Sequence, residues 1–597
     1  MNQLTVHFHH ANKTIPIQSG QLLSDVCAQA GYPLDLVCGG KGTCGKCQVL
    51  IRQNGIQKHV LACTTSVTES MILYLSSEQL AKEAQILSNH GENFVFNPAI
   101  SKHFYPKSKA QTSEYGSMFD EWLKAHPDSL NYEMIKKAHF LLSKKDISGI
   151  TLITYREKVI DVQPNDTRTH LYGMAVDIGT TSVAAYLYDL VTGQLLGTYS
   201  SLNQQIKKGA DVISRILHCE MADDGLDEMQ DAVVSTINKL IDQAANDYPA
   251  INDHLLDMVF CGNSTMQHLF HGLSPETLGR SPFISVTQDL LKATGHQLKL
   301  NVTQNAQTNF LPSLGGFVGG DTTSVLLALP DQELKRLVID LGTNGEIAVG
   351  SHGKYYVAST ACGPALEGAG LTFGMRGTHG AIESFEIIED TIHYHVIGDV
   401  KAQGICGSGI VDILAELLRQ KIILPSGKLL RQEDLIAKNP YHPLAKYLTL
   451  YDNSPAFLVV PPEDSASGQG VYVTQKDIRQ IQLAKSAIYT GCIMLLEKSG
   501  FNEDLLDEIL LSGAFGNYIN IHNAQLIGLI PKITGVSTYS IGNGAGLGVQ
   551  KYLLDQSAEA LCMDLKAHAL HVELASDPNF QNQYIHHMAF NGGSHVS

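Results

Sequence analysis

The stretch MAVDIGTTSVAAYLYD at residues 174–189 is echoed by LVIDLGTNGEIAVG at residues 337–350. Each reads as a buried strand that ends in an aspartate, followed by a glycine-centred turn and a returning strand. Backbone N–H groups and hydroxyls in such a turn bind phosphoryl oxygens, and an aspartate at the strand end can hold magnesium through water. Because Asp177 and Asp340 stand 163 residues apart in matching contexts, the repeat predicts two α/β lobes that face each other across a nucleotide.

A third stretch, EILLSGAFGN at residues 508–517, is again a buried strand that runs into a turn of small residues. Together the three stretches resemble the superfamily of acetate and sugar kinases, chaperones and actin, in which such a turn cradles the adenosine of ATP. The chain holds neither a Walker loop nor a Rossmann glycine motif after a strand, so those two nucleotide-binding folds are excluded. The predicted nucleotide-binding residues are Gly179, Thr180, Thr181, Gly342, Thr343, Asn344, Gly513, Ala514, Phe515 and Gly516.

Four carboxylates are candidates for the catalytic group, and the sequence leaves the choice among them open. Asp177 and Asp340 end the two repeated strands. Asp321 opens an apolar helix after a glycine-rich stretch, where it is either the helix N-cap or a carboxylate that acts on magnesium-bound water. Glu346 follows the second turn and either positions the attacking water or is an ordinary strand residue.

Five of the eleven cysteines lie in the first 63 residues, and four of them form the pattern C-x5-C-x2-C-x15-C. A zinc site would favour two C-x2-C pairs, whereas this pattern has one. A 2Fe–2S cluster takes three thiolates from one glycine-rich loop, and the plant ferredoxin spacing differs by one residue from the spacing here. The pattern therefore favours a 2Fe–2S cluster on Cys38, Cys44, Cys47 and Cys63, with zinc and unligated cysteines as the alternatives. Cys27 lies in a helical pattern and is expected in the core.

The surroundings of the cysteine loop fit a small β-rich module. Leu4, Val6 and Phe8 alternate with polar residues, residues 14–17 and 48–51 read as further strands, and Asn54-Gly55 is a hairpin turn. This order resembles the β-grasp fold of 2Fe–2S ferredoxins. The chain is therefore expected to be a multidomain α/β protein with an N-terminal β-grasp ferredoxin, a small α+β connecting domain and an actin-like ATPase fold of two lobes. The predicted boundaries are 1–88 for the ferredoxin, 89–130 for a linker, 131–170 for the connecting domain and 171–597 for the ATPase domain.

Composition excludes several classes of function. The net charge of −17 argues against sequence-independent nucleic-acid binding. No apolar run approaches the roughly 18 residues that a membrane helix needs, and the N-terminus lacks the pattern of a secretory signal. We therefore expect a cytoplasmic protein that neither spans a membrane nor binds nucleic acid.

A ferredoxin module ahead of such an ATPase core is a rare combination, and the chain resembles the reductive activators of corrinoid-dependent methyltransferases from end to end. That resemblance implies a one-electron transfer from the 2Fe–2S cluster that reduces a Co(II) corrinoid protein to Co(I), driven by Mg²⁺ and ATP. It also implies an external low-potential reductant, a homodimer and an anaerobic setting. Besides the cysteine loop, the stretches that carry it are LYGMAVDIGTT at 171–181, CGPA at 362–365, LTFGMR at 371–376, GAIE at 380–383, TQKDIRQIQLAK at 474–485 and LSGAFGNY at 511–518.

Three other functions compete with this one. An activator of 2-hydroxyacyl-CoA dehydratases would carry a 4Fe–4S cluster shared across a dimer, with Cys362 and Cys406 as possible ligands. A small-molecule kinase with a redox-regulatory module would release a phosphorylated product. A chaperone-like protein would need a peptide-binding domain after the ATPase core, and too little chain follows Gly548 for one.

Overall fold

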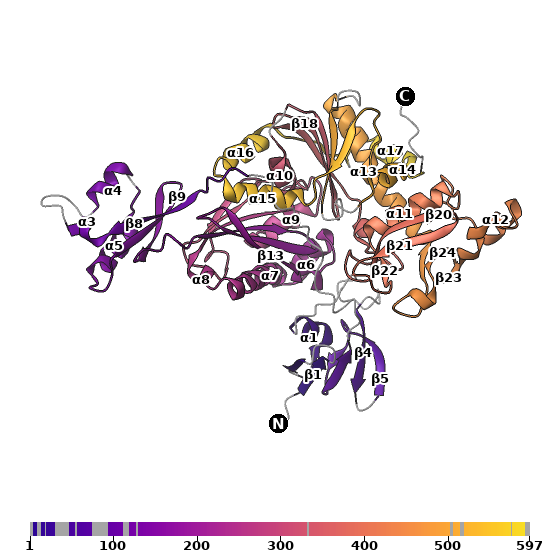
Figure 1. The fold of residues 1–597 in the computed structure, drawn as a ribbon, viewed down its shortest axis with the longest axis horizontal. Coiled ribbons are helices and arrows are strands. Elements are labelled where there is room, and N and C mark those ends of the chain that lie inside the picture. Colours follow the sequence, from indigo (N-terminus) through magenta and orange to yellow (C-terminus); the bar gives the residue numbers. More distant parts are fainter. Residues whose placement is uncertain are drawn as a thin grey trace.

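The computed structural model describes residues 4–8, 13–17, 19–29, 47–53, 56–74, 94–111, 119–126, 129–330, 333–501, 506–513, 519–574 and 576–590. Figure 1 shows the N-terminal module below a large two-lobed body, with a small domain at one end of that body. No helix in these ranges combines the length and the apolar character needed to cross a membrane.

The N-terminal module is built on a five-stranded sheet with the order β2-β1-β7-β4-β5. The predicted alternation holds in its first strand, where Val6 and Phe8 are buried. The predicted turn at Asn54-Gly55 lies outside the described residues. The elements of this module are β1 (Leu4–Phe8), β2 (Lys13–Ile17), β3 (Gln21–Leu22), α1 (Leu23–Gln29), β4 (Gln48–Gln53), β5 (Ile56–Leu61), β6 (Ser66–Val67) and β7 (Met71–Tyr74).

The small domain differs from the prediction in where it begins. Its antiparallel sheet has the order β10-β9-β8, so a strand from the expected linker is part of the domain. The sequence of this strand, β8, carries no clear period and therefore did not predict a strand. The structure shows it through its long-range pairing with β9. The elements are β8 (Ile100–Pro106), α3 (Lys107–Gln111), α4 (Asp120–Ala125), α5 (Tyr132–Ser143), β9 (Gly149–Tyr155) and β10 (Lys158–Pro164).

Trp122 fills the core of this small domain. Its indole Nε1 donates a hydrogen bond to the Ser129 hydroxyl at 2.8 Å, and its ring lies 4.2 Å from the ring of His126 between centroids. Both partners come from the part of the chain for which a linker was expected. The aromatic side chain therefore holds α4 and the segment that follows it against the sheet.

The first lobe of the large body is a six-stranded sheet with the order β13-β12-β11-β14-β16-β15. Strand β11 runs antiparallel to β12 and parallel to β14. The elements are β11 (Tyr172–Ile178), β12 (Ser182–Asp189), β13 (Gln194–Leu202), η1 (Gln204–Lys207), α6 (Val212–Met221), α7 (Gly225–Asp247), α8 (Ile251–His254), β14 (Leu255–Gly262), α9 (Ser264–His271), η2 (Glu276–Leu278), β15 (Leu291–Thr294) and β16 (Gln307–Phe310).

The second lobe repeats this plan in a sheet with the order β27-β26-β17-β18-β19-β28. Strand β17 is antiparallel to β18 and parallel to β26, as β11 is to its neighbours. The predicted duplication of α/β lobes is thereby confirmed. The elements are β17 (Arg336–Leu341), β18 (Gly345–Ser351), β19 (Lys354–Thr360), α13 (Gln475–Ser499), β26 (Glu508–Ser512), α14 (Ile521–Leu526), β27 (Ser537–Ser540), β28 (Leu570–His571) and α17 (Phe580–His586).

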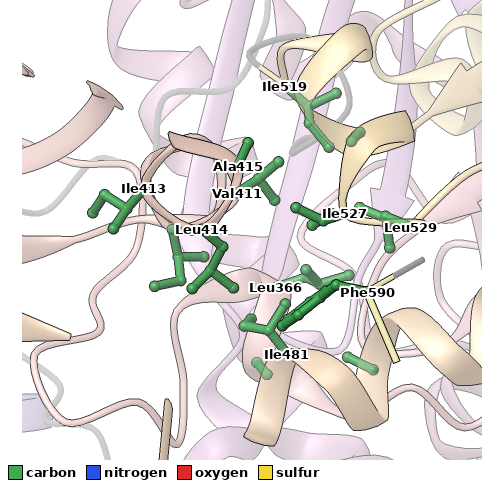
Figure 2. Packing of buried hydrophobic residues seen from close by; sticks show 14 of the residues in the cluster. Leu366, Val411, Ile413, Leu414, Ala415, Ile481, Ile519, Ile527, Leu529 and Phe590 are labelled. Atoms are coloured by element: carbon green, nitrogen blue, oxygen red, sulfur yellow. The ribbon is translucent and has the colours of Figure 1, made fainter. Parts of the chain in front are cut away.

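An outer subdomain is inserted into the second lobe between β19 and α13. Figure 2 shows side chains of its helix α11 packed against residues of the lobe, and the two share one hydrophobic core. The elements are η3 (Pro364–Glu367), β20 (Ala381–Ile388), β21 (Thr391–Val396), β22 (Gly404–Ile405), α11 (Gly407–Arg419), α12 (Gln432–Lys438), η4 (Pro443–Tyr447), β23 (Leu448–Tyr451), β24 (Ser454–Val460), η5 (Pro462–Asp464) and β25 (Val471–Thr474).

Helices α10 (Gly320–Ala328), α15 (Gly544–Leu554) and α16 (Ala558–His568) belong to a core that both lobes share. Helices α10 and α15 approach each other closely because Gly548 has no side chain. A Cβ added there would lie 1.7 Å from the Ser324 carbonyl oxygen. The joint between the lobes is therefore tightly packed at this point.

We expect the Gly548→Ala substitution to destabilise the protein by about 2 kcal/mol or more, because the backbone of α10 has to shift to admit the methyl group. Chemical unfolding followed by circular dichroism measures the change. The matched control is Gly377→Ala, where the new methyl would have its closest neighbour at 3.9 Å. Equal stability of the two variants would show that the helix contact is not tight.

Candidate nucleotide and iron–sulfur sites

A cavity of about 270 Å³ is lined by residues of both lobes. The two repeated turns, Gly179–Thr181 and Gly342–Asn344, both contribute to its wall. So do the four candidate carboxylates and Gly513 of the third stretch. Residues predicted from three separate stretches of sequence are thus brought together in one place. Ala514, Phe515 and Gly516 lie outside the described residues.

The first turn is held in place from behind by two polar side chains. The Asn203 amide donates a hydrogen bond to the Gly179 carbonyl at 3.0 Å, and the guanidinium of Arg215 donates to the Thr180 carbonyl. Arg215 is fully buried, and this burial lowers the pKa of its guanidinium to about 9. The group therefore stays charged at neutral pH and places a positive charge behind the turn.

The Thr180 hydroxyl accepts a hydrogen bond from the Asn263 amide at 2.9 Å. Asn263 is the N-cap of α9, where its side-chain oxygen accepts from the Met266 N–H. The hydroxyl's own proton is therefore directed away from Asn263 and can be donated to an oxygen in the cavity. This arrangement suits a phosphoryl oxygen.

The two strand-end aspartates have different partners. A carboxylate oxygen of Asp177 accepts from the Asn543 amide at 3.0 Å, while burial raises the pKa of that carboxyl. Burial also raises the pKa of Asp340 to about 6, and a hydrogen bond from the Ser512 hydroxyl opposes the increase. Asp177 also accepts from the Cys261 thiol at 3.7 Å, so each aspartate is anchored by neutral donors.

Asp321 is not the N-cap of its helix, so that alternative is wrong. The N-cap of α10 is Gly319, and Asp321 lies in the first turn with its carboxylate in the cavity wall. Its Oδ1 accepts from the Thr322 N–H at 2.8 Å. Burial and the charge of Asp340 raise the pKa of Asp321 to about 7.

Glu346 faces Asp340 across the β17–β18 pair and lines the same cavity. Burial, followed by the charges of Asp321 and Asp340, raises the pKa of Glu346 well above its usual range. It is a buried carboxylate of β18 in the cavity wall. Its position is compatible with the expected role in positioning water.

Magnesium fits this set of oxygen donors. Burial and mutual repulsion make the ionised carboxylates unfavourable, and a divalent cation would relieve both effects. Among the residues that the structure describes, no three His, Cys, Asp or Glu side chains converge closely enough to ligate one metal ion directly. A magnesium ion at this site would therefore be held largely through water, as Mg²⁺ commonly is.

Several residues of the site were not identified from the sequence. Asn203 and Arg215 belong to no motif, so nothing in the sequence marks them. Asn543 stands in the glycine-rich stretch IGNGAGLG at residues 541–548, which could have been read as another turn that opens a helix. Glu367 follows the CGPA stretch at 362–365 closely, but nothing in the sequence singled it out.

The third stretch reaches the cavity through Gly513. This glycine has a φ of +104°, and a Cβ there would lie 2.4 Å from the Leu341 carbonyl oxygen. The end of β26 therefore passes close to the end of β17, beside Asp340. A side chain at this position would separate the second and third stretches.

In the N-terminal module, the structure describes two of the four predicted cluster ligands, and their positions fit a metal cluster. The Sγ atoms of Cys47 and Cys63 are 3.2 Å apart and buried, which is too long for a disulfide bond of about 2.05 Å. Two thiolates on one tetrahedral metal ion lie about 3.8 Å apart, so a small adjustment would place both on one ion. Cys38 and Cys44 lie outside the described residues, and Cys27 is buried in α1, as expected.

Cys362 and Cys406, the possible ligands in the dehydratase-activator alternative, lie in the large body, where Cys406 lines the nucleotide cavity. The Cys362 thiol donates to the carbonyls of Gly342 and Thr343 behind the second turn. The Cys406 thiol donates to the Ile382 carbonyl. Both thiols are buried and used in packing, an environment that suits structural cysteines.

Comparisons with known proteins agree with this architecture. Residues 6–68 match the 2Fe-2S iron-sulfur cluster binding domain, residues 172–332 match the RACo middle region, and residues 335–595 match the C-terminal ASKHA domain of RACo. The chain is 43% identical over 592 residues to the corrinoid activation enzyme RamQ of Eubacterium limosum, covering 98% of this chain and 99% of that protein.

Two further proteins are similar. The [Co(II) methylated amine-specific corrinoid protein] reductase of Methanosarcina barkeri is 24% identical over 467 residues, covering 70% of this chain and 77% of that protein. A solved structure of a reductive activator for corrinoid, iron-sulfur protein superposes with a TM-score of 0.73 at 27% identity, and 99% of each chain is covered.

We expect Cys63→Ala to reduce the iron content from about two atoms per chain to near zero, because a 2Fe–2S cluster needs four protein ligands. Iron analysis and the visible absorption of the anaerobically purified protein measure this. The control is Cys27→Ala, a buried cysteine of the same module, which should keep the iron. Full iron and an unchanged spectrum in Cys63→Ala would contradict the ligand assignment.

We expect the nucleotide-free protein to be less stable than its Asp321→Asn variant at pH 8, with a Tm gap of about 2 °C or more. The pKa of Asp321 is raised to about 7 in the folded state, so the folded protein binds a proton that the unfolded chain binds only nearer pH 4. Stability linked to this group therefore rises as the pH falls through about 7. Thermal melts in metal-free buffer from pH 8 to pH 6 should show the gap closing. A Tm gap that stays constant with pH would contradict the raised pKa of Asp321.

Proposed function

The chain belongs to the family of reductive activators of corrinoid proteins, and we propose that it uses ATP to reduce a Co(II) corrinoid protein to the Co(I) state. The observation that carries this proposal is the union, in one chain, of a ferredoxin-type module with a two-lobed ATPase core. Identity of 43% to a corrinoid activation enzyme extends over nearly the whole length of both chains.

The proposed reaction transfers one electron. Co(II) in the partner gains it, the 2Fe–2S cluster on Cys38, Cys44, Cys47 and Cys63 supplies it, and an external low-potential reductant replaces it. Plant-type clusters have potentials near about −400 mV, and each 100 mV of uphill gap costs about 2.3 kcal/mol per electron. Hydrolysis of ATP by water to ADP and phosphate is the source of free energy for that gap.

The cavity residues have separate tasks in this proposal. Hydroxyls and N–H groups of the two turns bind the phosphoryl oxygens, and Asp177 and Asp340 hold magnesium through water. Asp321 and Glu346 are the candidates to orient the attacking water. Both carboxylates line the cavity wall, and each can accept a hydrogen bond from that water.

The remaining features of the proposal rest on the family resemblance and the composition. The chain works as a homodimer in an anaerobic cytoplasm, where thiolates are kept reduced. Residues 1–88 form the electron-transfer module, the small domain connects it to the body, and residues 171–597 form the ATPase domain. The protein partner of this chain is a corrinoid protein.

The test is an anaerobic assay with the cluster-loaded protein, a chemical reductant and a corrinoid protein in the Co(II) state. We expect the Co(I) absorbance to appear with ATP and not with a non-hydrolysable analogue. Cys63→Ala should abolish Co(I) formation and keep ATP hydrolysis, whereas Asp340→Asn should reduce both by about 100-fold or more, the scale of losing one positioned charge in a transition state. Absence of Co(I) with several corrinoid partners, despite a complete cluster, would refute the proposal and favour a kinase.

A further inference from the structure

Glu367 connects the two repeated turns. It is the last residue of η3, and its carboxylate lies in the wall of the nucleotide cavity. One oxygen accepts from the Thr181 hydroxyl of the first lobe at 3.1 Å. The other accepts from the Thr343 hydroxyl of the second lobe at 2.6 Å. A single carboxylate therefore joins the two lobes at their phosphate turns.

The same two hydroxyls belong to the turns that are proposed to bind phosphoryl oxygens. Each hydroxyl has one proton to donate, so it cannot serve Glu367 and a phosphoryl oxygen in full at the same time. The two acceptors also carry negative charge and repel each other. Glu367 and a phosphoryl group thus compete for the same two hydroxyl donors.

The backbone under Glu367 is fixed. Leu366 is buried, and Figure 2 shows it beside Ile481 and Phe590 in the shared core. The next residue, Gly368, has a φ of +81°, and a Cβ there would lie 2.1 Å from the Met375 carbonyl oxygen. Its N–H donates to the Ala365 carbonyl at 3.1 Å. The short helix is therefore rigid, and the Glu367 side chain is the part that can swing away.

We propose that Glu367 is an interlobe latch that nucleotide phosphate displaces. Its carboxylate bridges Thr181 and Thr343 while the cavity holds no nucleotide, and it leaves both hydroxyls when ATP enters. The latch rests on the proposed nucleotide site, and it makes the link between the lobes depend on whether phosphate is present. Because the competition is for phosphoryl oxygens, the latch weakens the binding of ATP and leaves the binding of adenosine unaffected.

Calorimetric titration of the full-length, cluster-loaded protein with a non-hydrolysable ATP analogue and Mg²⁺ tests this proposal. We expect Glu367→Ala to bind the analogue more tightly, by about tenfold or more, since both competing hydrogen bonds to the carboxylate are removed. Adenosine affinity should stay within about twofold of that of the unaltered protein. Glu367→Gln, which keeps the shape and loses the charge, should shift the analogue affinity in the same direction by a smaller factor.

The charge control is Glu383→Gln. Glu383 also lines the cavity, but its bond of 2.9 Å goes to His395 and not to either turn. Removing this charge should tighten the analogue by at most about threefold, because only a screened interaction at longer range is lost. If Glu383→Gln tightened analogue binding as much as Glu367→Ala, the effect would be one of general charge. That result would overturn the proposed latch.

Other outcomes are equally decisive. Unchanged or weaker analogue binding in both Glu367 variants, with normal thermal melts, would overturn the latch. So would a 100-fold loss of ATP turnover at unchanged affinity, because Glu367 would then act in catalysis. Failure of the unaltered protein to bind the analogue at all would instead refute the proposed nucleotide site, and the two failures are thereby distinguished.

Discussion

The large body is organised around a cluster of buried carboxylates in the wall of one cavity. Asp177, Asp321, Asp340 and Glu346 all line one cavity, and their carboxyl pKa values are raised. The nearby positive charge of Arg215 is directed at a backbone carbonyl and not at these groups. Burial of these carboxylates thus disfavours their ionised forms, and a bound magnesium ion would stabilise them. The pairing of the lobes, the glycine contacts at their joint and the Glu367 bridge all serve to keep these groups together.

Residues with a strong local signature were predicted from the sequence, and residues held only by long-range contacts were not. The twin strand–turn–strand repeats indicated both lobes and both phosphate turns, because glycine and aspartate are required there by backbone geometry and charge. The cysteine spacing indicated the ferredoxin module because a 2Fe–2S cluster requires its thiolate ligands at a characteristic spacing. By contrast, β8 lies in a polar stretch whose pairing partner is some fifty residues away, and Arg215 resembles any other helical arginine until its burial is seen. The role of Glu367 depends on two threonines from different lobes, a relationship that no linear pattern contains.

Residues 203–207 lie between the first phosphate turn and the N-terminal module. Asn203 is bonded to the first turn, and η1 follows it directly and ends at Lys207. Burial lowers the pKa of Lys207, and the charge of Asp25 in the N-terminal module opposes that decrease. Figure 1 shows α1 of the module on the side of the body where α6 lies. The residue that braces the phosphate turn is thus only four positions from the one that faces the electron-transfer module.

Trp122 is the single tryptophan of the chain, and it is packed inside the small domain against His126 and Ser129. Indole emission from this protein therefore originates entirely from the small domain, whose described residues do not line the nucleotide cavity. Fluorescence that responds to nucleotide or to a corrinoid partner would report a rearrangement of that domain, or energy transfer to a coloured group nearby, free of background from other indoles. Trp122 is therefore an intrinsic optical probe of the small domain.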